Sequence, residues 1–344
     1  EHLYAVIPAG GIGSRLWPLS RADAPKFLHD LTGSGQTLLR DTWDRIAPLV
    51  GDDRIAVVTG RAHRAAVEAE LPGIADKNVI LESEPRDSAA AIGLAAAILV
   101  RREPDVIIGS FHADHVIKGL RLFEHAVRQA VAVASAGYIC TIGIPPIEPA
   151  IGFGYIKRAG ELIIDGAPEA MFVERFVEKP SLETAREYVA DRSYLWNAGM
   201  FITRADVLLE QMAQSAPELH AGLLELAEAW DDRDRRGPVV DRVWPRLPKI
   251  AIDYSVAEPA AAAGGGGGPG GGARPLRVGR RGRLREPRQA QLGRAQGEPG
   301  DPRRERAGAG RRIQRHRREP DLAHHQPDRR ERHRGGRHRR RAAD

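Results

Sequence analysis

The sequence predicts an α/β fold: a Rossmann-like, mixed and mostly parallel sheet flanked by helices. Short apolar runs alternate with segments of helical periodicity over residues 1–259, which is the pattern of strands joined by helical crossovers. Residues 88–102 are almost all Ala, Ile and Leu, as expected for a buried helix. From residue 260 the composition changes to glycine and arginine. We therefore expect one folded domain over 1–259 and a low-complexity, disordered tail over 260–344.

The expected elements alternate along the folded part. Strands are expected at 3–8, 54–59, 78–82, 106–110, 138–144, 154–157, 172–178 and 199–203. Helices are expected at 37–49, 61–71, 88–102, 120–136, 182–191 and, as one or two helices, 205–230. Because ligands of such sheets bind beyond the carboxyl ends of the strands, polar residues that follow a strand are candidates for a site.

The first expected strand runs into a glycine-rich turn at residues 9–14. Glycine lets backbone N–H groups approach a ligand closely, and consecutive N–H groups in such a turn can bind an anion. Arg15 adds a guanidinium group that suits phosphate, and Lys26 adds a point charge. The segment therefore predicts a nucleoside triphosphate site. Its Gly-Gly-x-Gly-x-Arg order differs from the P-loop and from the dinucleotide-binding fingerprint.

The charge of the chain divides sharply between its two parts. The tail holds 24 of the 52 Lys and Arg residues and 9 of the 46 Asp and Glu residues. Its formal net charge is therefore +15, and that of residues 1–259 is −9. The folded part is thus acidic, and its charge argues against nucleic-acid binding.

Cysteine usage and hydropathy predict a cytoplasmic protein. The one cysteine, Cys140, lies in an apolar strand pattern, so we expect a buried thiol and no intrachain disulfide. A reducing compartment fits this usage. The chain contains no apolar run of about 18 residues, so no membrane partner is expected. Because it starts at Glu1 and not at methionine, we expect a few residues to precede it.

Residues 9–20 and the following Pro25-Lys26-Phe27 resemble the signature of the sugar-nucleotide pyrophosphorylases, a family of sugar nucleotidyltransferases. The resemblance continues through further motifs to about residue 259. It implies the nucleotide-diphospho-sugar transferase fold, with residues 1–259 as the catalytic domain. The Leu-Trp-Pro-Leu-Ser form at 16–20 most resembles members that use GTP and mannose 1-phosphate. The nucleotide-binding residues implied in this segment are Ala9, Gly10, Gly11, Gly13, Arg15 and Lys26, of which Arg15 and Lys26 are also catalytic.

Asp114 follows the buried strand expected at 106–110. An aspartate in this position commonly forms a turn or caps a helix. The family carries Ala-Asp-His here, and the resemblance implies that Asp114 is catalytic, contacts the nucleotide and binds Mg²⁺, which prefers one or two carboxylates beside substrate phosphates. His112 and His115 lack zinc-site spacing, so we expect structural roles. Ser88 lies in a segment similar to the family's base-binding one, with Asp-Ser replacing Asn-Thr, so helix capping and nucleotide contact both remain open.

Four later motifs resemble the sugar-phosphate half of the family's site. Gly154 of Gly-Phe-Gly-Tyr is the implied backbone donor. In Phe-Val-Glu-Lys-Pro, Glu178 would accept hydrogen bonds from sugar hydroxyls and Lys179 would neutralise the 1-phosphate as a catalytic group. Because neighbours in a strand point to opposite faces, we expect these two to serve different partners and not each other. Asn197 would bind sugar hydroxyls, and Asp253 lies in a segment like the family's Ile-Asp-Tyr-Ala-Val.

The tail does not resemble the family, and we interpret it as the product of a shifted reading frame. Codons permitted for residues 277–286, read one nucleotide later, encode Gly-Trp-Asp-Asp-Val-Gly-Asp-Phe-Ala, and the family carries Trp-Asp-Asp-Val-Gly at this point. There the Asp of Trp-x-Asp-x-Gly supplies a second metal carboxylate. We therefore expect the domain to lack its last elements and the chain as written to be poorly active and unstable. An arginine-rich, RNA-binding tail is the alternative.

The activity implied by the resemblance is nucleotidyl transfer from GTP to mannose 1-phosphate, with release of pyrophosphate. Arg15 would hold the leaving pyrophosphate, and Lys26 would hold the region of the α-phosphate. Such a reaction depends on positioning and charge neutralisation. The open alternatives are another base or sugar, such as glucose 1-phosphate, and a non-catalytic homologue that binds the nucleotide. A homodimer is compatible with the sequence.

Overall fold

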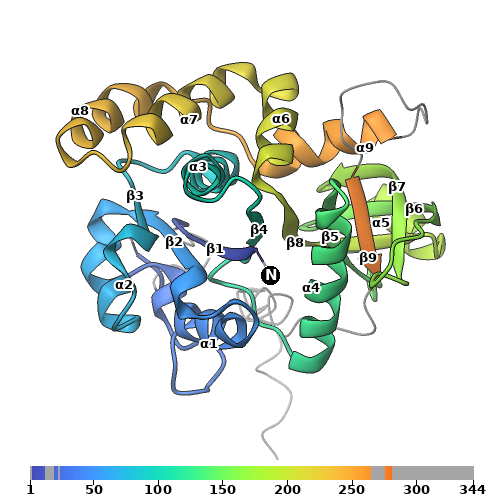
Figure 1. Ribbon diagram of the computed structural model, residues 1–344. Coiled ribbons are helices and arrows are strands. Elements are labelled where there is room, and N and C mark those ends of the chain that lie inside the picture. Colours follow the sequence, from blue (N-terminus) through green and yellow to red (C-terminus); the bar gives the residue numbers. More distant parts are fainter. Residues whose placement is uncertain (1, 12–18, 22–23, 265–275, 281–344) are drawn as a thin grey trace, which may run out of the picture. The chain divides into compact units, whose positions relative to one another are not determined.

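The computed structural model describes residues 2–11, 19–21, 24–264 and 276–280, and Figure 1 shows their arrangement. In this part of the chain the strands form one nine-stranded sheet in the order β3-β2-β1-β4-β8-β5-β9-β7-β6. Their bounds are β1 Leu3–Ala9, β2 Ile55–Gly60, β3 Val79–Glu82, β4 Ile107–Ser110, β5 Ile139–Ile144, β6 Gly154–Glu161, β7 Ala170–Glu178, β8 Tyr194–Arg204 and β9 Leu276–Arg280.

The sheet is mixed, and most of its described strands share one direction, as predicted. β1 pairs in parallel with β2 and β4, β2 with β3, and β5 with β9. β8 lies antiparallel between β4 and β5, and β7 lies antiparallel between β9 and β6. Of the described strands, β7 and β8 run against the others. The carboxyl ends of β1, β3, β4 and β5 therefore open at the same edge, where a ligand is expected.

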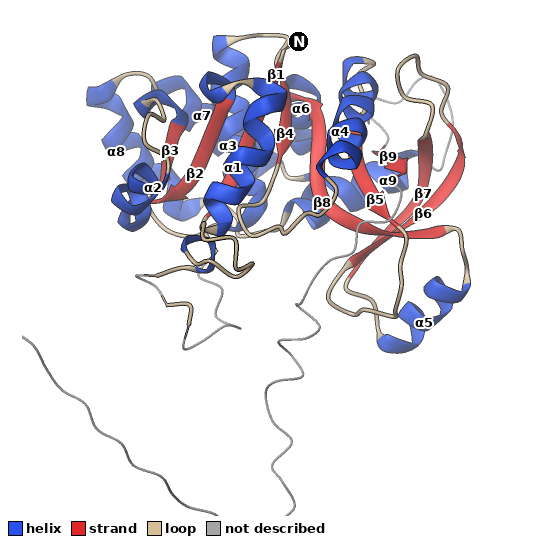
Figure 2. Ribbon diagram, turned by 90° about the horizontal axis from the view of Figure 1, so that it is seen from below, coloured by secondary structure: helices blue, strands red, loops and turns tan. Residues whose placement is uncertain are grey.

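Helices cover both faces of the sheet (Figures 1 and 2). Alternate residues of β1 divide between the two layers, since neighbours in a strand point to opposite faces. Val6 joins the apolar cluster of α3, whereas Ala5 and Ile7 join that of α1 and α4. One layer holds α3 (Asp87–Arg102), α6 (Ala205–Ser215), α7 (Pro217–Ala229) and α8 (Arg233–Val243), and the other holds α1 (Leu38–Val50), α2 (Arg64–Glu70) and α4 (Leu120–Ser135).

Helix α3 is buried over most of its length, which confirms the interpretation of its Ala-rich sequence. Its residues from Ala89 to Leu99 are all buried. Small side chains let α6 and α7 pack closely: a Cβ on Gly93 would lie 2.5 Å from Leu223 Cδ1. Among the described residues no helix, α3 included, combines the length and apolar composition that a bilayer span requires. Cys140, the one cysteine of the sequence, is buried in β5, as predicted.

Several element bounds differ from the sequence-based expectation. The segment 205–230 forms two helices, with Pro217 at the start of the second, as a proline that cannot continue a helix predicts. α8 was not predicted, and its mixed charges and internal Pro238 explain why. β8 begins at Tyr194, five residues before the expected 199, because Trp196 and Asn197 pair with β5 before an irregular step in the register. α5 (Leu182–Ala190) matches the helix expected at 182–191.

The chain remains ordered beyond the expected domain boundary at 259 and 260. Helix α9 (Glu258–Gly264) crosses this boundary, and Ala260 and Ala261 are buried. It follows a π-helical turn at Asp253–Ala257. β9 pairs in parallel with β5 and antiparallel with β7, so a strand occupies the interior of the sheet within the segment expected to be disordered. The rest of the predicted tail lies outside the described residues.

Candidate active site

Lys26 and Asp114 meet at the carboxyl edge of the sheet. Lys26 belongs to the short helix Lys26–Leu28, and Asp114 follows β4. Lys26 Nζ donates a hydrogen bond to Asp114 Oδ2 at 3.0 Å. The Asp114 side chain is 42% exposed, whereas that of Lys26 is 14% exposed. The predicted catalytic lysine and the predicted metal carboxylate are therefore partners in this structure.

Two histidines stand on either side of Asp114 in the sequence. Burial lowers the pKa of His112 and lowers that of His115 to about 3, so both are neutral at pH 7. Burial opposes ionisation of Asp114, but the fields of His115, Lys26 and His112 lower its pKa to about 2. Because the histidines are uncharged at pH 7, Lys26 is the cation that holds this carboxylate ionised there.

Gly199 lies against the histidines that flank Asp114 and binds Asn197, a predicted sugar-site residue. This glycine of β8 has a φ of +67°, and a Cβ placed on it would lie 3.6 Å from His115 Cε1 and 4.0 Å from His112 Cδ2. Its N–H donates to Asn197 Oδ1 at 3.1 Å. A glycine is needed here because other residues rarely adopt a positive φ, and the turn brings Asn197 beside the histidine pair.

Asn197 and Asp253 form a half-buried polar pair. Asn197 Nδ2 donates to Asp253 Oδ1 at 3.0 Å, and Thr141 Oγ1 donates to Asn197 Oδ1 at 2.7 Å. Burial, and then the charge of Glu178, raise the pKa of Asp253 to about 6. The structure thus brings together two predicted sugar-site residues that are 56 positions apart in the sequence.

Glu178 and Lys179 bind each other, contrary to the expectation that they serve different partners. Lys179 Nζ donates to Glu178 Oε1 at 2.6 Å, and this hydrogen bond raises the pKa of the lysine despite partial burial. Lys179 has a φ of +48°, so it has left strand geometry and the alternation rule no longer applies. Gly154 lies opposite Glu178 in the β6–β7 pair, and a Cβ on it would lie 2.5 Å from Glu178 Oε2.

Glu82 is a buried carboxylate that the sequence analysis did not single out. It ends β3, is 4% exposed, and lies against the glycine-rich loop, since a Cβ on Gly10 would stand 3.0 Å from Glu82 Oε2. Burial, and then the charge of Asp87, raise the pKa of Glu82 to about 7. Among the described residues no group donates a hydrogen bond to it. The sequence signal that could have identified Glu82 is its place as a carboxylate at the end of a predicted strand.

Ser88 and Asp87 begin helix α3 behind the site. Ser88 Oγ accepts a hydrogen bond from the backbone N–H of Ile252 at 2.9 Å, so this serine anchors the segment that carries Asp253. Asp87 has a φ of +68° and accepts from the N–H of Ser88. The N-cap residue of α3 is Arg86, and its side chain does not cap the helix. The capping role expected for this segment is therefore not seen at the N-cap position.

The nucleotide loop is described in part. The carbonyl of Ala9 accepts a hydrogen bond from Thr59 Oγ1 at 2.7 Å, which ties the end of β1 to β2. Gly10 is half-buried and Gly11 is exposed. The predicted residues Gly13 and Arg15 lie outside the described residues. Within the described ranges, no three His, Cys, Asp or Glu side chains gather closely enough to hold a metal ion.

Comparison with known proteins gives consistent matches. Residues 4–238 match the nucleotidyl transferase family. The chain is 40% identical over 217 residues to a putative mannose-1-phosphate guanylyltransferase of Vibrio cholerae, covering 62% of this chain and 46% of the relative. It is 38% identical over 263 residues to mannose-1-phosphate guanylyltransferase of Escherichia coli K12, covering 75% and 55%. The chain thus spans about half the length of these curated relatives.

Solved structures show the same fold. A crystal structure described as mannose-1-phosphate geranyltransferase from Thermus thermophilus matches with a TM-score of 0.70 and 30% identity, covering 83% of this chain and 75% of the other. A structure of mannose-6-phosphate isomerase from Helicobacter pylori matches with a TM-score of 0.59 at 22% identity, covering 81% and 97%. The second likeness concerns the fold alone.

Proposed function

The chain belongs to the nucleotidyl transferase family, and we propose that it carries the catalytic region of an enzyme that transfers a guanylyl group from GTP to mannose 1-phosphate. The products are GDP-mannose and pyrophosphate. The relatives named mannose-1-phosphate guanylyltransferase support this substrate pair. We further propose a cytoplasmic location and a homodimeric assembly, which the single buried cysteine and the sequence allow.

One observation carries the proposal: the phosphate-binding and sugar-binding candidates meet around Gly199. Gly199 lies against His115, which follows Asp114 in the sequence, and Asp114 binds Lys26. The N–H of Gly199 donates to Asn197, which in turn binds Asp253. A nucleotidyl transfer needs its two substrates end to end, with both phosphates in one place. The described residues supply a cation, Lys26, at that place.

The chemistry assigned to the chain is positioning and charge neutralisation. An oxygen of the sugar 1-phosphate attacks the α-phosphorus of the nucleotide in line, the bond to the β-phosphate oxygen breaks, and pyrophosphate leaves. Lys26 is proposed to neutralise the α-phosphate region, and Lys179 the attacking sugar phosphate. Arg15 would hold the pyrophosphate. Fixed charges aimed at developing charge supply most of the rate in such reactions.

The buried carboxylate of Glu82 supports guanine as the base. The edge of guanine presents two adjacent donors, N1–H and the 2-amino group, and an ionised carboxylate accepts hydrogen bonds with both oxygens. Adenine offers an acceptor at N1, and uracil offers a single N–H between two carbonyls. Because burial, and then the charge of Asp87, raise the pKa of Glu82 to about 7, two N–H donors from a base would stabilise its ionised form. Sites that hydrogen-bond a substrate group strongly reject analogues that lack it.

The sugar half is proposed to use five residues. Glu178, Asn197 and Asp253 provide acceptors and an amide for hydroxyl groups, Gly154 provides a backbone N–H, and Lys179 meets the phosphate. Lys179 Nζ donates a 2.6 Å hydrogen bond to Glu178 Oε1. This bond would have to break for the two side chains to bind the phosphate and the hydroxyl groups of the substrate. The exposure of the Lys179 side chain, 51%, leaves it free to turn.

Mg²⁺ is the metal we propose, with Asp114 as its protein ligand. The carboxylate of Asp114 is ionised, with a pKa of about 2, and accessible, which suits a hard cation that also binds substrate phosphates. When bound, the metal would neutralise phosphate charge. The second carboxylate of the corrected reading frame would fall at position 280, the last residue of β9, which pairs in parallel with Gly143 of β5.

The proposal is tested by a panel of nucleotides and sugars. We expect pyrophosphate release with GTP and mannose 1-phosphate to exceed that with UTP or ATP and with glucose 1-phosphate. Glu82→Gln should reduce the GTP preference, because an amide offers one acceptor where the carboxylate offers two. A panel in which glucose 1-phosphate reacts fastest would favour another sugar nucleotidyltransferase.

A non-catalytic nucleotide-binding role is the second candidate. Asp114 is the one protein carboxylate that we assign to the metal, and no described cluster adds another. Calorimetric GTP binding without turnover in a chain with the corrected reading frame would favour this role over catalysis.

A further inference from the structure

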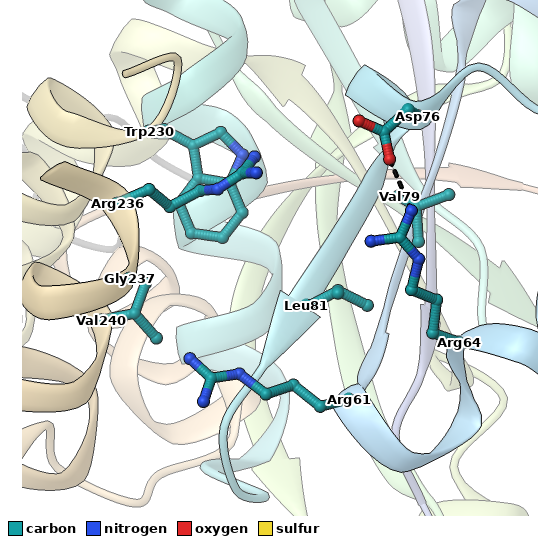
Figure 3. A pocket seen from close by; sticks show the side chains of 9 residues that line it. All are labelled: Arg61, Arg64, Asp76, Val79, Leu81, Trp230, Arg236, Gly237 and Val240. Carbon is teal, nitrogen blue, oxygen red and sulfur yellow. Dashed lines mark hydrogen bonds and ion pairs between the residues drawn. The ribbon is translucent and has the colours of Figure 1, made fainter. Parts of the chain in front are cut away.

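A hollow lies beside β3, the strand at the edge of the sheet. Figure 3 shows the side chains around it. Its volume is about 90 Å³, well above the roughly 10–15 Å³ that one water molecule requires. It is lined by Val79 and Leu81 of β3, Arg61, Arg64 and Asp76 from the segments before β3, and Trp230, Arg236, Gly237 and Val240 from the end of α7 and from α8.

This hollow is distinct from the candidate active site. Leu81 lines it, and Glu82, the next residue of β3, lies against Gly10 of the nucleotide loop. Leu81 and Glu82 point to opposite faces of β3, and neither Glu82 nor Gly10 lines the hollow.

The lining combines guanidinium groups with an apolar floor. Val79, Trp230 and Val240 are buried, and the guanidinium groups of Arg61, Arg64 and Arg236 stand around them (Figure 3). The lining holds three arginines and one aspartate. Asp241 and Glu68, which are not part of the lining, also pair with Arg61 and Arg64.

The three arginines differ in how they are held. Arg61 pairs with Asp241 at 2.9 Å, and Arg64 pairs with Glu68 and Asp76. These pairs join largely exposed side chains, and such pairs contribute little and rearrange easily. Arg236 lies over the ring of Trp230, with 5.7 Å from Cζ to the ring centroid. No side chain among the described residues accepts a hydrogen bond from it. Its donors are therefore available to a ligand.

We propose that this hollow binds a small organic phosphate, with the phosphate between the guanidinium groups and an apolar or aromatic part against Trp230 and Val240. A phosphate monoester carries a charge of roughly −1.5 to −2 at pH 7, so it can accept hydrogen bonds from Arg236 and compete with the exposed carboxylates for Arg61 and Arg64. Guanidinium groups bind phosphate oxygens in pairs. The apolar floor favours an ester over the free ion. This proposal is independent of the proposed catalytic function.

The test is calorimetric titration of the full chain with phenyl phosphate and, separately, inorganic phosphate. We expect saturable binding of both, tighter for phenyl phosphate, and no binding of benzyl alcohol. Arg236→Ala should weaken phenyl phosphate binding about tenfold, the loss expected for one charged hydrogen-bonding partner. Arg236→Lys should restore part of it. Arg186→Ala, an exposed arginine of α5, is the matched control and should leave binding unchanged.

Lys26→Ala separates the hollow from the candidate active site. Binding that is lost in Lys26→Ala but kept in Arg236→Ala would place the ligand at the nucleotide loop and overturn the proposal. Equal loss in Arg236→Ala and Arg186→Ala, or no saturable binding to the wild type, would also overturn it. A circular dichroism melt of each variant shows whether a loss of binding reflects unfolding.

Discussion

Lys179 Nζ lies 2.6 Å from Glu178 Oε1, although the two residues are neighbours at the end of β7. The positive φ of Lys179, +48°, turns its side chain back onto that of Glu178. The positive charge of Lys179 thereby offsets the negative charge of Glu178, whose side chain is 10% exposed and lies near Asp253. A substrate phosphate would compete with Glu178 for this ammonium group.

Replacing Lys179 with alanine should weaken binding of mannose 1-phosphate by about tenfold or more, since hydrogen bonds to charged groups contribute about 1.5–3 kcal/mol. Isothermal titration of the full chain measures this. Lys157→Ala is the matched control, because Lys157 forms a 2.7 Å pair with Glu174 between β6 and β7 and is not a predicted site residue. If the two substitutions change mannose 1-phosphate binding equally, Lys179 does not bind this substrate.

Gly154→Ala should destabilise the domain. The new Cβ would stand 2.5 Å from Glu178 Oε2 and 3.2 Å from Phe176 Cζ, and overpacking of this kind costs about 1–3 kcal/mol. Urea unfolding gives the change in free energy. Gly160→Ala, in the same strand, meets no atom within 4 Å and should change stability by less than about 0.5 kcal/mol. If Gly154→Ala is as stable as Gly160→Ala, the Glu178 side chain does not pack closely against Gly154.

Glu82 makes stability depend on pH. Folding raises the pKa of Glu82 from 4.5 to about 7. Between pH 4.5 and pH 7 the carboxyl group is therefore protonated in the folded state and ionised in the unfolded state. The stabilisation that this proton provides is fully present below pH 4.5 and is lost as the pH rises through 7. The loss is up to about 3 kcal/mol. Urea unfolding at about pH 5 and about pH 8, on either side of the folded-state value, should show this decline in the wild type.

The same measurement on Glu82→Gln isolates the effect of this carboxyl group. The amide does not titrate, so the decline over the same pH interval should be smaller than in the wild type. Asp253, with a pKa of about 6, contributes a decline of the same sign in both proteins. Identical pH profiles for the wild type and Glu82→Gln would show that Glu82 is not protonated in the folded state.

Restoring the reading frame should restore activity. The corrected chain carries Trp-Asp-Asp-Val-Gly, and its second carboxylate would fall at position 280, the last residue of β9, which pairs with the carboxyl-terminal part of β5. We expect its pyrophosphate release from GTP to exceed that of the present chain at least about a hundredfold, in line with the loss of a charge-stabilising group. Comparable turnover by the two chains would refute the frameshift interpretation, and the gene sequence around codons 260–272 provides a direct check.

Much of the fold was predictable because its signals are local. The Ala-rich segment of α3 and the apolar run of β4 reflect burial directly. Thr37 caps α1 through its side chain, at the residue where the predicted helix begins. α8 escaped prediction because its sequence is dominated by charge and contains Pro238. β9 escaped because an arginine-rich segment lacks the apolar pattern of an interior strand.

The sequence by itself determined the order of the elements from β1 to α7 and most candidate residues of the site, since periodicity and motifs are properties of neighbouring positions. Only the tertiary structure decided which side chains meet. The pairing of Lys26 with Asp114 and of Asn197 with Asp253 joins residues 88 and 56 positions apart. The burial of Glu82 and the turning of Lys179 toward Glu178 likewise depend on packing and on a backbone angle. Protonation, distance and contact arise from the folded surroundings, so no local pattern encodes them.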